Sequence, residues 1–394
     1  MTTKINNEHK KVYVPNLRFP EFQGEWEKQK LCDISSIVGR IGFRGYTTND
    51  IVEKGMGAIA LSPTNIVNNQ LTYDKDNTYI SMSKYEESPE IMINRGDVIF
   101  VKTGSTVGKV AYVDKLICKT TLNPQVVVLK DIKCDNYILS VIMSTRKFQN
   151  KIQRITVGGA VPTLSQVAMG NIFISLPAAK EQEKISKFIS LFDERISTQN
   201  KIIEDLKKLK SAISKRLLHN DNWTTFKIQD IAEIGRGRVI SSVEIERQKY
   251  PLYPVYSSQT SNNGIMGYLD DYMFDGEYIT WTTDGANAGT VFYRNGKFNC
   301  TNVCGTLKIH PQFNCYFVSL VLQQATMKYV SSNLANPKLM NNTMASIKIR
   351  IPDIVMQKQL SKVFQTLDSC LLAHQKTCKM YMQEKQYLLC QMFI

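Results

Sequence analysis

Two long stretches of the chain place hydrophobic residues at alternating intervals of three and four positions, from Glu181 to Leu218 and from Leu360 to Met392. This 3.5-residue period is typical of a coiled-coil seam rather than of one face of a globular helix. Two such seams in one chain are expected to bury against each other. The predicted seam positions are Ile185, Ile189, Phe192, Ile196, Ile203, Leu206, Ile213, Leu217, Leu360, Phe364, Leu367, Leu371, Cys378, Tyr381, Leu388 and Met392.

Polar residues interrupt both seams at matching places. Gln199 and Lys210 occupy two slots in the first seam, and His374 and Lys385 occupy the same two slots in the second. We interpret these residues as polar layers that set the helix register at some cost in stability. A functional role for the His374 imidazole is the weaker alternative.

The rest of the chain consists of short β-branched and aromatic runs separated by turn residues, which is typical of strands. Helical spacing of hydrophobic residues predicts one helix over 137–152 and another over 315–330. Each globular part is therefore predicted to be α+β with a mainly antiparallel sheet. The predicted strands are 97–102, 109–113, 125–129 and 171–176, followed by 278–282, 290–293 and 306–309.

The chain repeats itself. Residues 336–394 align without a gap on 161–219, and 12 of the 59 aligned positions are identical. Weaker matches extend upstream of both segments. A repeat of this size is a domain rather than a solenoid unit. The shared landmarks are Pro162, Leu164, Ile172, Ile174, Pro177 and Gln182 in the first copy, and Pro337, Leu339, Ile347, Ile349, Pro352 and Gln357 in the second.

These patterns predict a pseudo-two-fold α+β protein with two similar globular domains separated by two long helices. Because a whole globular part lies between the helices in sequence, no hairpin is required, and the pseudo-two-fold repeat favours an antiparallel coiled coil. Such a pair would act as a spacer that holds two domains a set distance apart. The predicted segments are 1–176, 177–219, 220–351 and 352–394.

The composition is that of an ordinary globular protein, with 43% hydrophobic and 21% charged residues. The segment 1–11 is polar and no apolar run is long enough for a membrane span, so we expect a cytoplasmic protein without membrane contact. Lys and Arg outnumber Asp and Glu by 49 to 35, which gives a net charge of +14. A basic surplus suits a partner with phosphate groups, although a merely lysine-rich composition is the plain alternative.

The nine cysteines favour reduced thiols over a metal centre. Cys300 and Cys304 are four residues apart, but no second Cys or His pair has the spacing that would complete a zinc site. We therefore predict no metal, with a structural zinc as the weaker alternative.

Catalytic motifs are incomplete. Gly104–Lys109 is one residue short of a phosphate-binding loop, Val110 stands where a metal-binding hydroxyl belongs, and the corresponding segment at Gly285 has no lysine. A turn between strands is the better interpretation. Asn123-Pro124 and Asn336-Pro337 lack the further residues of an adenine methyltransferase loop. None of the four histidines lies in a nucleophile motif, so we predict no active site.

The segment Leu17–Trp26, the Pro177 and Gln182 pair before the heptad helix, and the duplication of the whole unit carry a resemblance. With these features, residues 15–394 resemble the specificity subunit of type I restriction-modification enzymes. The resemblance implies a non-catalytic bacterial defence protein that reads double-stranded DNA through two target recognition domains. Each domain would read one half of a split, asymmetric site, and the helix pair would set the gap between the halves.

The resemblance also implies partners and their cofactors. The helices would dock two methyltransferase subunits that use S-adenosylmethionine to methylate adenine at N6, and two restriction subunits would add translocation and cleavage with ATP and Mg. No cofactor is expected on this chain.

The DNA-contacting residues can be proposed only by residue type and position. Arg suits guanine, Asn suits adenine, and Lys or Thr suits phosphate or either base type. A solvated surface role remains the alternative at each position. A coiled-coil scaffold with two ligand-binding modules is the rival function, and a phosphate-loop NTPase using Lys109 is a distant third. The candidates are Arg40, Arg44, Lys102, Thr103, Lys109, Arg236, Arg238, Thr283, Asp284 and Asn287, with the 156–159 loop as a further candidate.

Overall fold

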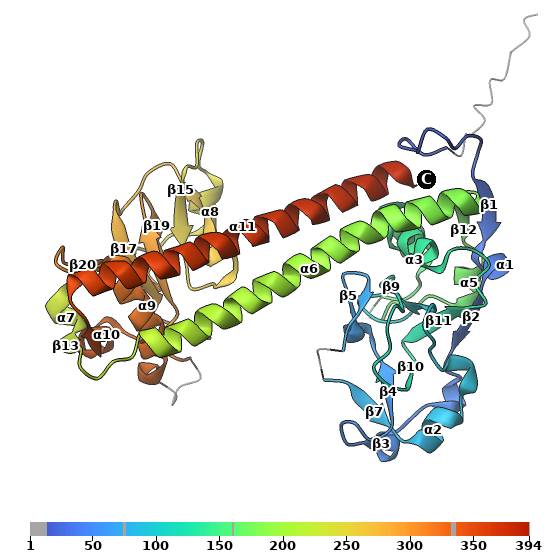
Figure 1. The fold of residues 1–394 in the computed structure, drawn as a ribbon, viewed down its shortest axis with the longest axis horizontal. Helices are drawn as coiled ribbons and strands as arrows, with labels where there is room; N and C mark the ends of the chain where they lie inside the picture. Colours follow the sequence, from blue (N-terminus) through green and yellow to red (C-terminus); the bar gives the residue numbers. More distant parts are fainter. Residues whose placement is uncertain (1–13, 74–75, 160, 332–335, 394) are drawn as a thin grey trace, which may run out of the picture. The chain divides into compact units, whose positions relative to one another are not determined.

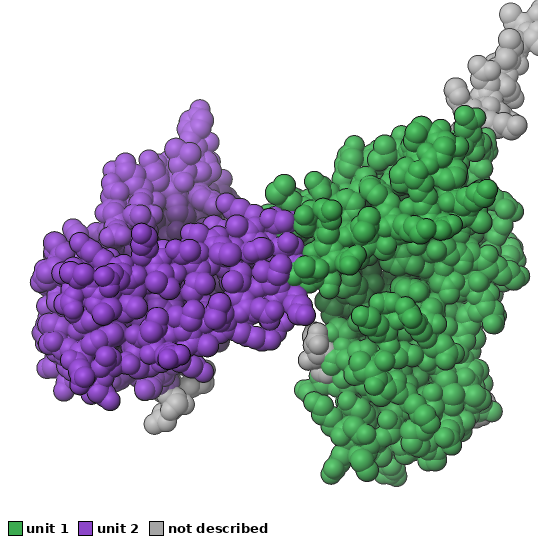
Figure 2. Space-filling view, in the orientation of Figure 1, with its two compact units in different colours: residues 1–198, 378–394 green, residues 199–377 purple. Residues whose placement is uncertain are grey.

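The computed structural model describes residues 14–73, 76–159, 161–331 and 336–393. They form two compact units, one of residues 1–198 and 378–394 and the other of residues 199–377 (Figure 2). We call these unit 1 and unit 2, and each is described by itself. No helix in the described part of the chain is both long and apolar enough to cross a membrane. The polar segment 1–11 lies outside the described residues.

The main sheet of unit 1 has the strand order β2-β11-β8-β9-β6-β5, and only its β6–β9 pair is parallel (Figure 1). Alternate residues of β8 enter two different cores. Val98 and Phe100 face one hydrophobic cluster, and Ile99 and Val101 face another. The sheet is therefore covered on both faces. Its strands are Ser36–Gly39 (β2), Val126–Lys130 (β11), Val98–Val101 (β8), Val110–Tyr112 (β9), Gln70–Leu71 (β6) and Ile66–Val67 (β5).

A second sheet in unit 1 has the order β10-β4-β7-β3, and β1 pairs with β12. These strands are Thr120–Leu122 (β10), Ala58–Leu61 (β4), Thr78–Ile80 (β7), Ile51–Val52 (β3), Glu27–Lys30 (β1) and Phe173–Leu176 (β12). The helices before the first long helix are Leu31–Ile34 (α1), Met82–Glu86 (α2), Asn136–Ser144 (α3), Arg146–Ile155 (α4) and Gln166–Gly170 (α5).

Unit 2 repeats this plan with the sheet β14-β20-β17-β18, the small sheet β16-β15-β19 and the pair β13–β21. Gly305 in β20 lies directly against the buried Trp281 indole, and a Cβ there would come within 2.2 Å of the ring. The strands are Thr224–Lys227 (β13), Ala232–Arg236 (β14), Tyr253–Tyr256 (β15), Ile265–Leu269 (β16), Glu277–Thr282 (β17), Val291–Asn295 (β18), Asn299–Cys300 (β19), Cys304–Ile309 (β20) and Lys348–Ile351 (β21). The short helices are Ile228–Ile231 (α7), Ser242–Glu246 (α8), Cys315–Ala325 (α9), Thr326–Tyr329 (η6) and Asn341–Ser346 (α10).

The predicted α+β class with mainly antiparallel sheets is confirmed, but both predicted short helices need correction. The first is two helices, because Thr145 has an extended backbone and its hydroxyl accepts a hydrogen bond from the Phe148 N–H that starts α4. In unit 2 the regular helix α9 ends at Ala325, and the tighter η6 follows. Hydrophobic spacing continues across both breaks, so spacing alone did not reveal them.

The two long helices are Ala179–Leu217 (α6) and Ile354–Met392 (α11), and each contributes to both units. In unit 1 the early part of α6 contacts the late part of α11, where Asp193 pairs with Lys385. In unit 2 the late part of α6 contacts the early part of α11, where Lys210 pairs with Asp368. The helices are therefore antiparallel, as predicted.

Most of the predicted seam is buried or half-buried. Ile185, Ile189 and Phe364 are each 1% exposed or less. The prediction is wrong at Leu217, which is 37% exposed, whereas Leu218 is 3% exposed. The buried position moves by one residue because the chain leaves the helix there and Leu218 joins the core of unit 2.

Two equivalent glutamines explain the repeated Pro and Gln landmarks. Gln182 donates to the Pro177 carbonyl at 2.8 Å, and its side-chain oxygen accepts from the Asp135 N–H at the start of α3. Gln357 makes the same two bonds in unit 2, to the Pro352 carbonyl and from the Asn314 N–H. Each glutamine thus ties the first turn of a long helix to the first turn of a core helix.

A second interaction is also present in both units: one aspartate accepts a hydrogen bond from a tyrosine and forms an ion pair with a lysine. In unit 2 the Tyr316 hydroxyl donates to Asp368 at 2.6 Å, and Lys210 of α6 pairs with the same carboxylate. Tyr137, Asp193 and Lys385 form the corresponding set in unit 1. Burial, followed by the neighbouring carboxylate, raises the pKa of both tyrosines. Both lysine slots of the seams are therefore occupied by ion pairs between the helices.

The two remaining polar residues of the seams, Gln199 and His374, contact each other. His374 Nδ1 lies 2.7 Å from Gln199 Oε1, and these two residues are equivalent positions of the repeat. Contact between a residue and its own repeat counterpart is a further structural sign of the duplication. The expectation of a polar layer at this position is confirmed.

We expect replacement of Asp368 by alanine to lower the free energy of unfolding by about 1–3 kcal/mol, because Tyr316 would keep a buried hydroxyl without its acceptor. Urea unfolding followed by circular dichroism measures the change. Ser369→Ala, at the exposed neighbouring position, is the matched control and should leave the midpoint unchanged. Equal midpoints for the two variants would contradict a structural role for the tie.

Candidate nucleic-acid interface

The glycine segment 104–108 is a turn between antiparallel strands β8 and β9, as the incomplete motif predicted. The Gly108 N–H donates to the Val101 carbonyl at 3.0 Å, and Gly104 has a φ of +103°. The Lys109 ammonium donates to the Ile66 carbonyl rather than facing a phosphate-sized nest. The segment at 285–289 has the same hairpin role between β17 and β18.

The two Pro-X-Leu landmarks bind these turns. In unit 1 the Gly104 N–H donates to the Pro162 carbonyl, and the Leu164 N–H donates to the Lys102 carbonyl at 2.8 Å. In unit 2 Gly285 and Pro337 make the first of these bonds, and Leu339 and Thr283 make the second. The loop that carries the candidate residues at 102–103 and 283–284 is thus built in the same way in both units.

In unit 1 the structure brings Lys102 and Thr103 beside the further candidate loop. Thr103 pairs with Thr163, which also pairs with Val157, so residues 102–103 and 156–158 lie at one edge. Both candidate side chains are half-exposed. This edge presents a cation and hydroxyls from separate segments, which suits contacts to phosphates and base edges.

Arg40 requires a correction. Its side chain is 5% exposed, and its guanidinium donates to the Leu122 carbonyl at 2.9 Å and to the Thr121 hydroxyl at 3.1 Å. Burial lowers its pKa. These bonds argue against a direct base contact, and we assign Arg40 to holding the 40–46 loop against β10. Arg44 is half-buried and lies near the Glu90 carboxylate and the Glu87 carbonyl.

In unit 2, Arg236 and Thr283 lie together, but only Arg236 is exposed. Its guanidinium donates to the Asn302 carbonyl at 2.5 Å and to the Thr283 hydroxyl at 3.2 Å. Thr283 has no exposed surface, which is a second correction to the candidate set. Its role is to orient Arg236.

The other unit 2 candidates are partly engaged within the chain. Arg238 is exposed and pairs with Glu244 through both terminal nitrogens, which raises its pKa. Asp284 accepts from the Asn336 side chain at 2.6 Å, and Asn287 donates to the Ser258 carbonyl at 3.1 Å. A nucleic acid would compete with these bonds rather than meet free side chains.

Arg294 was not singled out by the sequence patterns, yet it organises this side of unit 2. Its guanidinium lies 3.5 Å from the Tyr256 ring centroid and donates to the Thr280 hydroxyl and the Asn263 carbonyl. It is 7% exposed, and burial lowers its pKa. No sequence motif marks it, because its partners come from three separate segments.

The cysteines carry no metal-site geometry. Cys300 and Cys304 are buried, and burial raises the pKa of both thiols, that of Cys304 to about 11. Within the described residues, no three His, Cys, Asp or Glu side chains gather where they could hold a metal.

The two units share one plan and carry different side chains at the same loop ends, which defines a duplicated two-domain protein. Comparison with known families is more specific. The type I restriction modification DNA specificity domain matches the chain twice, over residues 23–208 and 220–379. The chain therefore belongs to the type I specificity domain family.

Curated relatives and solved structures agree with this assignment. A putative type I specificity subunit of Mycoplasma pneumoniae is 36% identical over 229 residues, covering 55% of this chain and 81% of the relative. The MpnII specificity subunit of the same organism is 41% identical over 160 residues, covering 40% of this chain and 46% of that protein. The crystal structure of a type I S subunit from M. genitalium shares the fold, with a TM-score of 0.64, 16% identity and coverage of 97% and 99% of the two chains.

We expect Arg40→Ala to lower the free energy of unfolding by about 2 kcal/mol, because two buried acceptors would lose a charged donor. Arg44→Ala should cost less than about 0.5 kcal/mol, because its ion pair is partly solvated. Urea unfolding of both variants tests the assignment. An unchanged midpoint for Arg40→Ala, combined with altered DNA recognition, would return Arg40 to the DNA-contacting set.

Proposed function

We propose that this chain is the DNA specificity subunit of a type I restriction-modification complex and that each unit reads one half of a bipartite, asymmetric target. The observation that carries this proposal is the pair of specificity domains with different residues at equivalent loop ends. Lys102-Thr103-Gly104 in unit 1 corresponds to Thr283-Asp284-Gly285 in unit 2. One scaffold with two different loops supports two different half-site sequences.

The antiparallel helix pair would set the gap between the half-sites. The two ion pairs between the helices lie on either side of the Gln199–His374 contact, and together these three contacts favour one register of the two helices. If the helices cannot slip past each other, the number of residues in each helix fixes the length of the spacer.

The outer faces of α6 and α11 would dock methyltransferase subunits. Several large apolar residues on these helices remain exposed, including Leu191 at 52%, Leu209 at 48%, Leu372 at 50% and Tyr387 at 63%. Exposed apolar residues in such number are typical of protein–protein contacts. A scaffold without DNA recognition would also need such a surface, but it does not account for the two DNA specificity domains.

The catalytic chemistry would belong to the partners. Two methyltransferase subunits would use S-adenosylmethionine to methylate adenine at N6, and two restriction subunits would use ATP and Mg for translocation and cleavage. The whole complex would act in the cytoplasm, where bacterial DNA is found.

The function is tested by band-shift titration of the chain with its methyltransferase partner over a series of salt concentrations. The target is first found by long-read mapping of methylated adenines in a host that carries the chain. We expect binding of the target duplex to be at least about a thousandfold tighter than binding of a random duplex, with both affinities falling as salt rises. Absence of both methylation and salt-dependent binding would favour the scaffold alternative.

The spacer is tested by inserting one heptad into each long helix at opposing positions of the seam. Seven residues lengthen a helix by about 10.5 Å, or about three base-pair rises of 3.4 Å. We expect the gap to grow by about one to three base pairs, because DNA twist must also be accommodated, while both half-sites keep their sequence. Methylation mapping reads the outcome, and a changed half-site with an unchanged gap would contradict the spacer role.

A further inference from the structure

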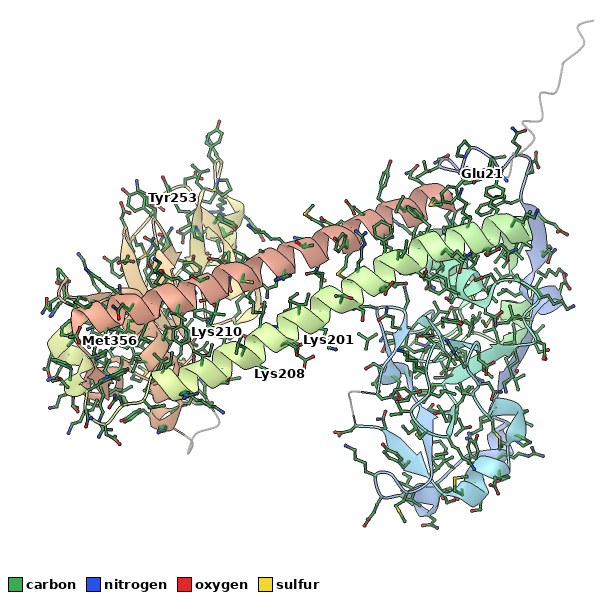
Figure 3. The ribbon with its side chains drawn as sticks, in the orientation of Figure 1. Glu21, Lys201, Lys208, Lys210, Tyr253 and Met356 are labelled. Carbon is green, nitrogen blue, oxygen red and sulfur yellow. The ribbon has the colours of Figure 1, made fainter. Side chains whose placement is uncertain are left out.

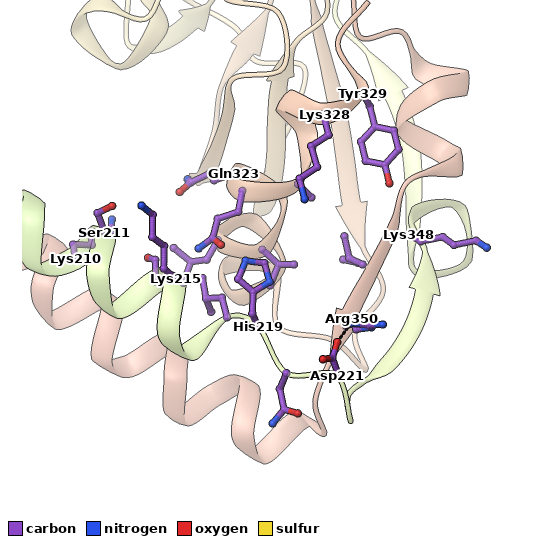
Figure 4. A pocket seen from close by; sticks show the side chains of 18 of the residues that line it. Lys210, Ser211, Lys215, His219, Asp221, Gln323, Lys328, Tyr329, Lys348 and Arg350 are labelled. Carbon is purple, nitrogen blue, oxygen red and sulfur yellow. Dashed lines mark hydrogen bonds and ion pairs between the residues drawn. The ribbon is translucent and has the colours of Figure 1, made fainter.

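Unit 2 contains an open cleft of about 1020 Å³ between the end of α6 and the globular domain. The last turns of α6 form one wall, and α9, η6 and β21 form the other. Figure 4 shows Lys215 and His219 on one side and Lys328 on the other, with its side chain directed toward His219. Arg350 and Asp221 lie together at the base of the same view.

The cleft has a surplus of positive charge. Lysines 207, 215, 328 and 348, which we call the cleft lysines, line it without a hydrogen bond or ion pair to any described residue. Two further cations in the lining are neutralised, Lys210 by Asp368 and Arg350 by Asp221. Like charges gathered around one cavity destabilise the free protein and favour an anionic ligand.

The charge of the cleft is shared only in part with unit 1, where Lys28 and Lys151 line a smaller pocket beside Phe173. Applying the offset of 175 residues, Lys207 corresponds to Met382 and Lys215 to Cys390, while Lys348 corresponds to Phe173. Lys210 and its counterpart Lys385 are both retained, and both make the helix ion pair described above. The lysine that makes the ion pair between the helices is therefore present in both copies. Three of the cleft lysines, Lys207, Lys215 and Lys348, align with residues of the other copy, and none of those aligned residues is charged.

The remaining lining indicates what kind of anion fits. Hydroxyls of Ser211 and Ser214 and amides of Gln323 and Gln324 line the cleft beside the lysines. Lysine, serine and glutamine side chains are common phosphate contacts that carry no sequence preference. The cleft is open and much larger than one phosphate group, which suits a continuous chain of phosphates.

The cleft is also connected to the loop that holds the candidate base-reading residues. Tyr329 lines the cleft, and two residues further on the Ser331 N–H donates to the Lys338 carbonyl at 3.0 Å. Lys338 in turn pairs with Asp284. A strand of DNA that contacts the loop at 283–284 therefore has a basic path available next to it within the same unit.

We propose that this cleft binds the phosphodiester backbone of the DNA that flanks the half-site read by unit 2, and that unit 1 makes fewer such contacts at the corresponding surface. The proposal rests on the function proposed above and adds an asymmetry to it. The duplex is held by more phosphate contacts on the unit 2 side, and these contacts contribute affinity without sequence preference.

The test compares the complex of the full chain and its methyltransferase with the same complex carrying glutamine at all four cleft lysines. Binding of a duplex with the mapped target is measured from low to high salt. We expect the slope of log affinity against log salt to become less steep by about 0.9 for each lost contact, and so by about 2 to 4 in total. The methylated sequence should not change.

A matched variant carries glutamine at Arg247, Lys249, Lys297 and Lys308 in the globular part of unit 2. These four residues are exposed and do not line the cleft, and none lies on the long helices, whose exposed Lys201 and Lys208 are labelled in Figure 3. The matched variant removes the same charge and should keep the wild-type slope. An equal loss of slope in both variants would show a general charge effect and would overturn the proposal.

Shortened duplexes test the asymmetry directly. We expect trimming of the flank next to the half-site of unit 2 to weaken wild-type binding, and trimming of the other flank to have a smaller effect. The cleft variant should lose this difference.

The outcomes distinguish the two proposals. If the wild type binds the target and the cleft variant keeps the wild-type salt slope, the cleft proposal alone is overturned. If the wild type does not bind the target, the proposed function is overturned. Loss of methyltransferase association in the cleft variant, measured by sedimentation, would assign the cleft to a protein partner instead.

Discussion

Each globular core of this protein is completed by residues at the ends of both long helices. In unit 1, Leu389, Met392 and Phe393 from the end of the chain are buried in the core, and the Phe393 ring meets Trp26 edge-on at 5.9 Å. In unit 2, Leu218 at the end of the first long helix has the same role. Burial of each such side chain contributes about 1.5–3 kcal/mol. Formation of the helix pair and completion of the two cores are therefore coupled.

This coupling explains which features the two repeats share and which they do not. The glutamine ties at 182 and 357 and the aspartate ties at 193 and 368 join helix to core, and both copies retain them. Loop ends and surface charges do not contribute to that junction, so they are free to differ. A duplicated frame with unlike loops allows one fold to read two sequences, and the basic cleft extends this difference to the number of phosphate contacts that each unit makes.

The sequence patterns were most accurate where structure depends on local periodicity. The seam follows the 3.5-residue pattern in both long helices, beginning at Ile185 in α6 and ending at Met392 in α11. The main strands lie close to their predicted places. The failures have local physical causes. Thr145 interrupts a hydrophobically continuous helix by capping the next one, and Leu218 replaces Leu217 where the chain turns into the domain. Arg40 and Thr283 were expected to be accessible, but both are buried among partners that are distant in sequence or contributed by another strand.

By itself, the sequence determined the duplication, the α+β class, the two heptad helices and the family resemblance, because repetition and periodicity are visible along one dimension. Only the tertiary structure decided which polar seam residues pair, which candidate arginines are exposed, and that several lysines from separate elements surround one cleft. These properties depend on burial and on distances between residues far apart in the chain. Hydrophobic spacing contains no information about them.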